Sequence, residues 1–238
     1  MGHNLEEFEL LNIRSQLQRA AMHAFNFYRG AIPLAECQAV VEESYELLGR
    51  TAVIKHHLVA LADRWSIERL RRIGILGDRL GRTAPDVLFV DKDDAGLAAA
   101  AAALLAGYAR GRVHAGSAGH QPAPGLDPTL TRIAAERDLD VSDAFPKAIT
   151  AEAVQAADAL VLLGGVTAPT IDPIAAADAE FPRPRIERWD VPDLENQPDE
   201  AVRAALDDLD VRVLVLLAEM LSARRPVTEP TGSSARDG

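Results

Sequence analysis

Apolar residues recur every three or four positions along the first third of the chain, in three separate stretches. These stretches cover residues 10–25, 33–48 and 52–73, and Gly30 interrupts the chain between the first two. Such spacing places apolar side chains along one face of a helix. Three amphipathic helices joined by short turns bury their faces against one another. The pattern therefore predicts a three-helix bundle over residues 1–75.

The pattern changes after residue 85, where short, continuous apolar runs alternate with helical stretches. The run Val87–Val90 is followed by a polar turn and an alanine-rich segment over residues 98–108, which predicts a buried strand, a loop and a helix. Further strands are expected near 112–115, 159–163 and 185–189, and further helices over 128–137 and 199–221. This alternation predicts a three-layer α/β/α domain with a four-stranded parallel sheet over residues 86–222.

Two segments have the composition of connecting or unstructured chain. Residues 76–85 contain Gly77, Gly81 and Pro85 among charged residues, which is typical of a linker between domains. Residues 223–238 are rich in proline, threonine, serine and glycine, and we expect a disordered tail there.

The charge is strongly acidic and unevenly distributed. The formal net charge is −11, and the excess of acidic residues falls after residue 82. An acidic surface repels phosphates, which excludes a nucleic-acid interface on the second domain. No apolar run has the length of a membrane span, and the N-terminus lacks the pattern of a signal peptide. With Cys37 as the single cysteine, these features predict a cytoplasmic protein.

Several spaced motifs in the second domain resemble those of the low-molecular-weight tyrosine phosphatases and the arsenate reductases built on the same fold. The motifs are the loop 87–98, Ser117-Ala118-Gly119, Phe145-Pro146-Lys147, the run 157–164, and Trp189-Asp190-Val191-Pro192-Asp193. The bundle in turn resembles the three-helix domain that precedes this domain in some bacterial arsenate reductases, on residues 41–48 and 55–65. The resemblance implies the two-domain fold and, for an intact enzyme, phosphatase or arsenate reductase activity.

The residues that such activity needs are replaced. At the start of the loop the family carries Cys, five residues and Arg-Ser, and the matching positions here are Asp91, Leu97 and Ala98. The reaction requires a thiolate nucleophile and an arginine that binds the oxyanion in a bidentate manner. Asp193 matches the general-acid position, although Leu194 follows it where the family usually has proline. The resemblance with these departures predicts a pseudoenzyme, without cofactor, that has a binding or regulatory role.

Partners of two kinds are expected for such a protein. The leading hypothesis is action through a protein partner, and self-association through the bundle into a homo-oligomer is a second form of contact. The cluster Arg64, Arg69, Arg71 and Arg72 offers cations to an acidic partner. However, cations near a helix C-terminus are favoured by the helix dipole, so a solvated helix surface is the preferred interpretation.

An altered enzyme is the alternative. The sequence Asp91-Lys92-Asp93 after an apolar strand also fits phosphatases in which the first aspartate attacks phosphorus and carboxylates hold Mg²⁺. In that case Asp91, Asp93 and Asp94 are the metal candidates. The competing interpretation is that Asp93 or Asp94 caps the helix that begins near Ala95. His114 and His120 flank the next strand and are minor candidates for a site.

Overall fold

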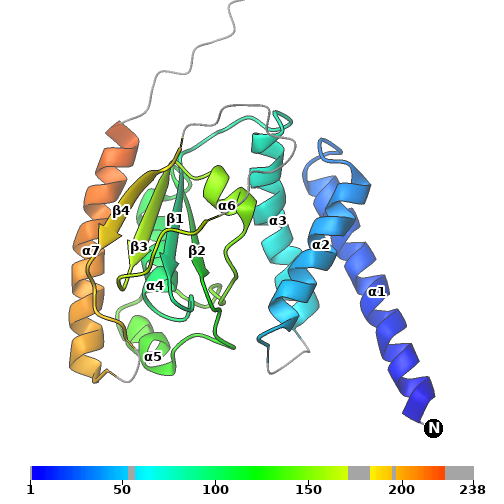
Figure 1. The fold of residues 1–238 in the computed structure, drawn as a ribbon, viewed down its shortest axis with the longest axis horizontal. Helices are drawn as coiled ribbons and strands as arrows, with labels where there is room; N and C mark the ends of the chain where they lie inside the picture. The colour runs from blue at the N-terminus through cyan, green and yellow to red at the C-terminus, as the bar shows by residue number, and fades with distance from the viewer. Residues whose placement is uncertain (1, 53–56, 171–182, 195–196, 223–238) are drawn as a thin grey trace, which may run out of the picture.

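Three long helices form an N-terminal bundle (Figure 1). The computed structural model describes residues 2–52, 57–170, 183–194 and 197–222. The helices are α1 (Gly2–Phe27), α2 (Leu34–Gly49) and α3 (Leu58–Leu76). The predicted three-helix bundle is confirmed. The third helix begins at Leu58, later than its apolar stripe indicated, and residues 53–56 lie outside the described part of the chain.

Small side chains let α1 approach its neighbours closely. Ala20, Ala21 and Ala24 are buried against Cys37, Val40, Val41 and Leu70. The helix ends where Arg29 and Gly30 take positive φ angles of 52° and 75°. Glycine adopts this left-handed conformation at little steric cost. The bundle thus has its own small apolar core, as its sequence pattern predicted.

The second domain is built on four parallel strands, as expected. They are β1 (Asp86–Asp91), β2 (His114–Gly119), β3 (Ala159–Leu163) and β4 (Arg185–Trp189), in the order β2-β1-β3-β4. All residues of the two central strands, β1 and β3, are buried. The expected position of β2, near 112–115, was too early, because its actual residues are mostly glycine, alanine and serine and form no apolar run.

Helices cover both faces of this sheet. On one face α4 (Leu97–Ala109), α5 (Pro128–Glu136) and α7 (Asp199–Ser222) share a core with Val87 and Phe89 of β1. On the other face Leu88 and Val90 pack with α6 (Ala151–Gln155). Alternate residues of one strand therefore serve two cores. The helix α6 was not predicted, because one and a half turns give no measurable periodicity.

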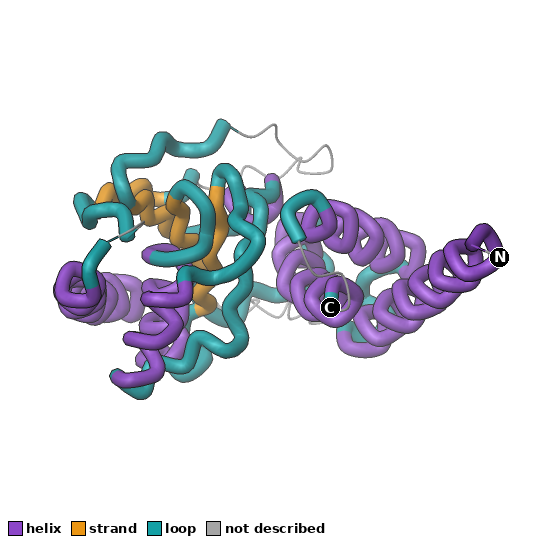
Figure 2. The backbone as a smooth tube through the Cα atoms, turned by 90° about the horizontal axis from the view of Figure 1, so that it is seen from below, coloured by secondary structure: helices purple, strands orange, loops and turns teal. Residues whose placement is uncertain are grey.

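The bundle stands beside the β2 edge of the sheet (Figure 1), and Figure 2 shows the strands on one side of the molecule and the bundle helices on the other. The helix α3 lies between the sheet and the other two helices, and it contacts α6. None of the described helices is both long and apolar enough to cross a membrane.

The arginines of α3 join the two domains. Arg69, 3% exposed, donates to Glu152 Oε1 at 2.5 Å and to Ser44 Oγ at 3.1 Å. Arg72, 2% exposed, donates to Asp86 Oδ1 at 3.1 Å, and Arg71 also donates to Asp86. The preferred interpretation of a solvated helix surface was wrong for Arg69, Arg71 and Arg72. Their acidic partners include Glu152 and Asp86 of the second domain, besides Glu43 and Glu68 within the bundle.

The segment between the domains folds back onto the bundle. Arg79 forms a bidentate ion pair with Glu36 of α2. The side chain of Leu80 lies so close to Gly74 that a Cβ there would come within 2.6 Å of its Cδ1. The residues expected to form a linker are thus fixed by packing and charge. The expected tail, 223–238, lies outside the described residues.

Candidate functional site

The acidic loop lies at the carboxyl end of β1 and leads into α4. This is where ligand sites of open α/β sheets occur, because helix N-termini and strand ends present free amides. Asp91 is the last residue of β1 and is 6% exposed. Its Oδ1 accepts hydrogen bonds from the amides of Asp93 at 3.1 Å and Asp94 at 2.6 Å, and its Oδ2 accepts one from Ala98 at 2.9 Å. The carboxylate therefore accepts hydrogen bonds from three backbone amides of the loop and of the first turn of α4.

This arrangement makes the Asp91 carboxylate the anion of its own loop. Backbone amides converging at a helix N-terminus favour a negative charge. Burial raises the pKa of Asp91, while the bonds from Ala98, Asp94 and Asp93 oppose that rise. The expectation that Asp93 or Asp94 caps α4 was wrong. Gly96 stands at the N-cap position and makes no side-chain cap, and Asp91 reaches the Ala98 amide instead.

Leu97 and Ala98 follow the loop as the first residues of α4. Leu97 is 4% exposed and belongs to the same apolar core as Leu163, Trp189 and Leu194. Ala98 is fully buried. The position at which the resemblance would place an oxyanion-binding arginine is thus part of the core.

The three carboxylates of the loop point to three different partners. Asp93 Oδ1 accepts from the amide of Ala95 at 3.0 Å. Asp94 Oδ2 accepts from the amide of Lys147 at 2.9 Å and lies 3.3 Å from its Nζ. No group of three histidine, cysteine, aspartate or glutamate side chains is arranged to hold a metal ion in the described parts of the chain. The carboxylates do not converge as cation ligands would.

Asp193 lies at the mouth of the loop, where the sequence placed it. A cavity of about 30 Å³ is lined there by Asp91, Lys92, Asp93, Gly96, Leu97, Leu163, Gly164, Asp193 and Leu194. A volume of this size admits only about two water molecules. The Leu194 side chain lies against Gly96 and closes the cavity from that side. A Cβ added at Gly96 would lie 3.5 Å from Leu194 Cδ1.

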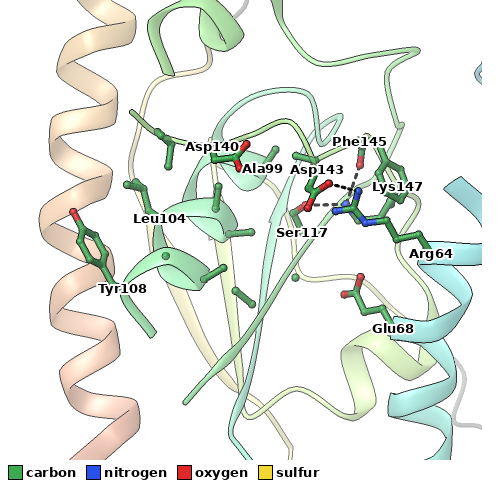
Figure 3. Close-up of a pocket in the computed structure, with 18 of the residues that line it drawn as sticks. Arg64, Glu68, Ala99, Leu104, Tyr108, Ser117, Asp140, Asp143, Phe145 and Lys147 are labelled. Carbon is green, nitrogen blue, oxygen red and sulfur yellow. Dashed lines mark hydrogen bonds and ion pairs between the residues drawn. The ribbon is translucent and has the colours of Figure 1, made fainter. Parts of the chain in front are cut away.

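A much larger cavity, of about 710 Å³, lies between the bundle and the second domain. Figure 3 shows Arg64 and Glu68 of α3 on one side, and Ala99, Leu104 and Tyr108 of α4 on the other. Ser117 and Lys147 lie between them, and Lys147 contacts Asp94 of the acidic loop. Of the residues that line this cavity, only Arg64 was a candidate from sequence.

The two histidine candidates are far apart. His114 begins β2 and pairs with Asp86 at the start of β1, so it lies at the opposite end of the strands from the loop. His120 follows the carboxyl end of β2 and bonds to the carbonyl of Thr167 at 3.0 Å. The structure therefore brings only His120 to the end of the sheet where the loop lies.

Comparison with known proteins finds similarity in both parts of the chain. The family described as "Protein-tyrosine-phosphatase-like, N-terminal domain" matches residues 17–74. A thioredoxin-dependent arsenate reductase from Corynebacterium glutamicum is 29% identical, with a TM-score of 0.73 over 87% of this chain and 98% of that chain. The chain has a low-molecular-weight phosphatase/arsenate reductase-like fold with an N-terminal helical domain.

More distant structures match a little over half of this chain. An arsenate reductase from Archaeoglobus fulgidus is 24% identical over 56% of this chain and 98% of that chain, with a TM-score of 0.42. A YwlE mutant from Bacillus subtilis is 17% identical over 58% of this chain and 99% of that chain, with a TM-score of 0.47.

Lys147 and Ser117 contact the acidic loop through Asp94. Lys147 Nζ donates to Ser117 Oγ at 3.1 Å and to the carbonyl of Phe145 at 2.8 Å, and Lys147 is 7% exposed. Both residues belong to motifs that carried the resemblance, but their contact with Asp94 was not predicted. Burial raises the pKa of Asp94 to about 7, while the Lys147 cation lowers it and the Asp91 charge adds to the rise.

The Asp94 carboxyl is expected to make stability fall as the pH rises from about 4 to about 7. A group whose pKa is raised in the folded state binds its proton more tightly there than in the unfolded chain. Its contribution is therefore complete below the unfolded pKa and is lost as the pH rises through the folded pKa, by up to about 1.4 kcal/mol per pH unit. Urea unfolding of the wild type and Asp94→Asn across this window measures the effect. Parallel pH profiles for the two proteins contradict it.

Proposed function

We propose that the protein is a non-catalytic binding or regulatory protein whose phosphatase-like domain has lost oxyanion chemistry. The observation that carries this proposal is the position of the Asp91 carboxylate. It accepts three amides at the point where the loop would otherwise present them to an oxyanion. A substrate oxyanion would have to displace a tethered, buried anion and then tolerate its charge.

The neighbouring residues support the same proposal. A carboxylate fixed by three hydrogen bonds is a poor nucleophile compared with a thiolate, and no cysteine lies nearby because Cys37 is in the bundle. Leu97 offers no charge to a transition state and packs in the core. The cavity at the loop admits no more than about two water molecules.

The alternative of a cation-dependent hydrolase finds less support in this geometry. Such a mechanism needs several carboxylate oxygens free to face one ion. Both oxygens of Asp91 are engaged by amides, and Asp94 faces Lys147. Rebuilding the loop around a cation would break these contacts together.

Assays of phosphate-ester hydrolysis and of arsenate reduction test the proposal. We expect no turnover above the buffer rate, with or without magnesium, for the wild type and for Asp91→Asn. A cysteine-containing enzyme of the same fold, assayed in parallel, shows that the conditions permit catalysis. Magnesium-dependent turnover by the wild type that disappears in Asp91→Asn would favour the hydrolase and overturn the proposal.

A further inference from the structure

The outer edge of β2 faces the large cavity between the domains. β2 is an edge strand, because the sheet order is β2-β1-β3-β4. The amide of His114 bonds inward to the carbonyl of Pro85 at 2.8 Å. Successive residues of a strand turn their backbone groups to opposite edges. The N–H and C=O groups of Ala115, Ser117 and Gly119 therefore point away from β1.

The chain itself uses one end of this edge. The amide of Gly119 donates to the carbonyl of Lys147 at 2.8 Å, and Gly119 forms an isolated parallel bridge with Ala148. In the described part of the chain, no outward backbone hydrogen bond joins Ala115 or Ser117 to another segment. The edge thus accepts strand pairing at Gly119 and is unoccupied before it.

The cavity runs along this unoccupied portion. It is lined by the consecutive residues Ala115, Gly116 and Ser117. Neighbouring strand residues point to opposite faces, so a cavity that touches all three must follow the edge. Its walls are α3 and α4 (Figure 3), and the lining residues of α4 include Ala102 and Ala106. The small side chains of that face leave room beside the strand.

We propose that this edge binds an extended peptide segment of a partner protein by strand addition. The inference rests on the proposed binding role and names the kind of partner. Main-chain hydrogen bonds to Ala115 and Ser117 would supply affinity, as in other strand-addition sites. With a rise of about 3.3 Å per residue, the three residues of β2 that line the cavity span about 10 Å, so the portion of the peptide that pairs with them is about three residues long.

The walls of the cavity select a single extended segment. The edge of another folded sheet brings its own covering helices, which would collide with α3 and α4, so a second copy of β2 is excluded as the occupant. The charged side chains that line the cavity are four cations and four anions. This balance favours an uncharged peptide, with small or medium side chains facing the alanines of α4. Its binding should depend only weakly on salt.

Amide exchange in the free protein tests whether the edge is open. The amides of Ala115 and Ser117 are expected to exchange at least about tenfold faster than those of Gly116 and Ala118, which face β1. Equal protection of the four amides would mean that the edge is already covered, and the proposal would fail.

Selection from a displayed library of random decapeptides tests binding directly. We expect the wild type to enrich peptides that bind with micromolar Kd and that lose about tenfold or more when alternate residues are N-methylated. Ala115→Pro removes an outward N–H and leaves the bonds to β1 in place, because proline is tolerated on an edge strand. It should weaken binding by a similar factor.

A second pair of variants tests the same site even if Ala115→Pro fails to fold. Ala106→Tyr fills the cavity from an exposed position on α4, and Ala218→Tyr adds the same group at an exposed position on α7. Only the former should abolish binding. The strand-addition proposal is overturned if no peptide is enriched, or if the enriched peptides bind Ala115→Pro and Ala106→Tyr as tightly as the wild type. Neither outcome affects the assays of catalysis. Turnover in those assays overturns the proposed function and leaves the peptide result standing.

Discussion

Replacing Asp91 with alanine is expected to turn the acidic loop into a phosphate-binding site. The amides of Asp93, Asp94 and Ala98 would lose their acceptor. Leaving these donors unpaired should destabilise the folded protein by about 2–3 kcal/mol. Phosphate can then occupy the vacated place and restore about 2.7 kcal/mol at a concentration one hundred times its Kd. Thermal unfolding at increasing phosphate concentration measures this response.

Asp193→Ala is the matched control for this experiment. It also removes a carboxylate that lines the small cavity, but from an exposed residue. Its stability should change by less than about 1 kcal/mol and should gain little from phosphate. The interpretation of Asp91 as the anion of its own loop fails if phosphate stabilises the wild type and Asp91→Ala equally.

Asp86→Asn is expected to destabilise the protein by about 3 kcal/mol, because it removes the buried carboxylate that Arg71 and Arg72 share and leaves Arg72 with Glu68 as its one counter-charge among the described residues. Asp86 is fully buried and accepts from both Arg71 and Arg72. Burial alone would raise the pKa of Asp86, but Arg72 and Arg71 hold it below its usual value. The free energy of unfolding from urea titration at neutral pH gives the loss.

The comparison for Asp86→Asn is Asp143→Asn, which breaks the ion pair between Arg64 and Asp143 on the same interface. That pair is 2.7 Å long, but its side chains are 46% and 80% exposed. Exposed pairs contribute at most about 1 kcal/mol. Similar losses in the two variants would show that burial of Asp86 does not set the strength of the domain contact.

Much of the fold was predictable because its buried elements have unbroken apolar patterns. The strands β3 and β4 were predicted with the boundaries that the structure has, and β1 within a residue at each end. Ala115 to Gly119 gave no such signal, because a strand of small residues is defined by the neighbours it pairs with. The burial of Arg69 and Arg72 was unpredictable for a similar reason, since each has one of its acidic partners in the other domain.

The loop shows where prediction of the site ended. Sequence placed Asp91 at the end of β1 and Asp193 nearby, and both lie there. The direction of the carboxylates was not accessible, because it depends on the backbone of the loop. Asp94 has a positive φ of 54°, and its partner Lys147 is 53 residues away. Helix capping was therefore assigned to Asp93 or Asp94 and is performed by Asp91.

The segment Phe145–Lys147, or latch, contacts the acidic loop, the end of β2 and the bundle. Lys147 holds the acidic loop through Asp94 and holds the end of β2 through Gly119. Phe145 packs against the apolar cluster of the bundle that contains Leu58 and Trp65. A displacement of this latch cannot stay local, because it would loosen a loop, a strand edge and a domain contact together. Phe145 and Lys147 would therefore still be needed for the structure of the protein after the loop has lost its chemistry.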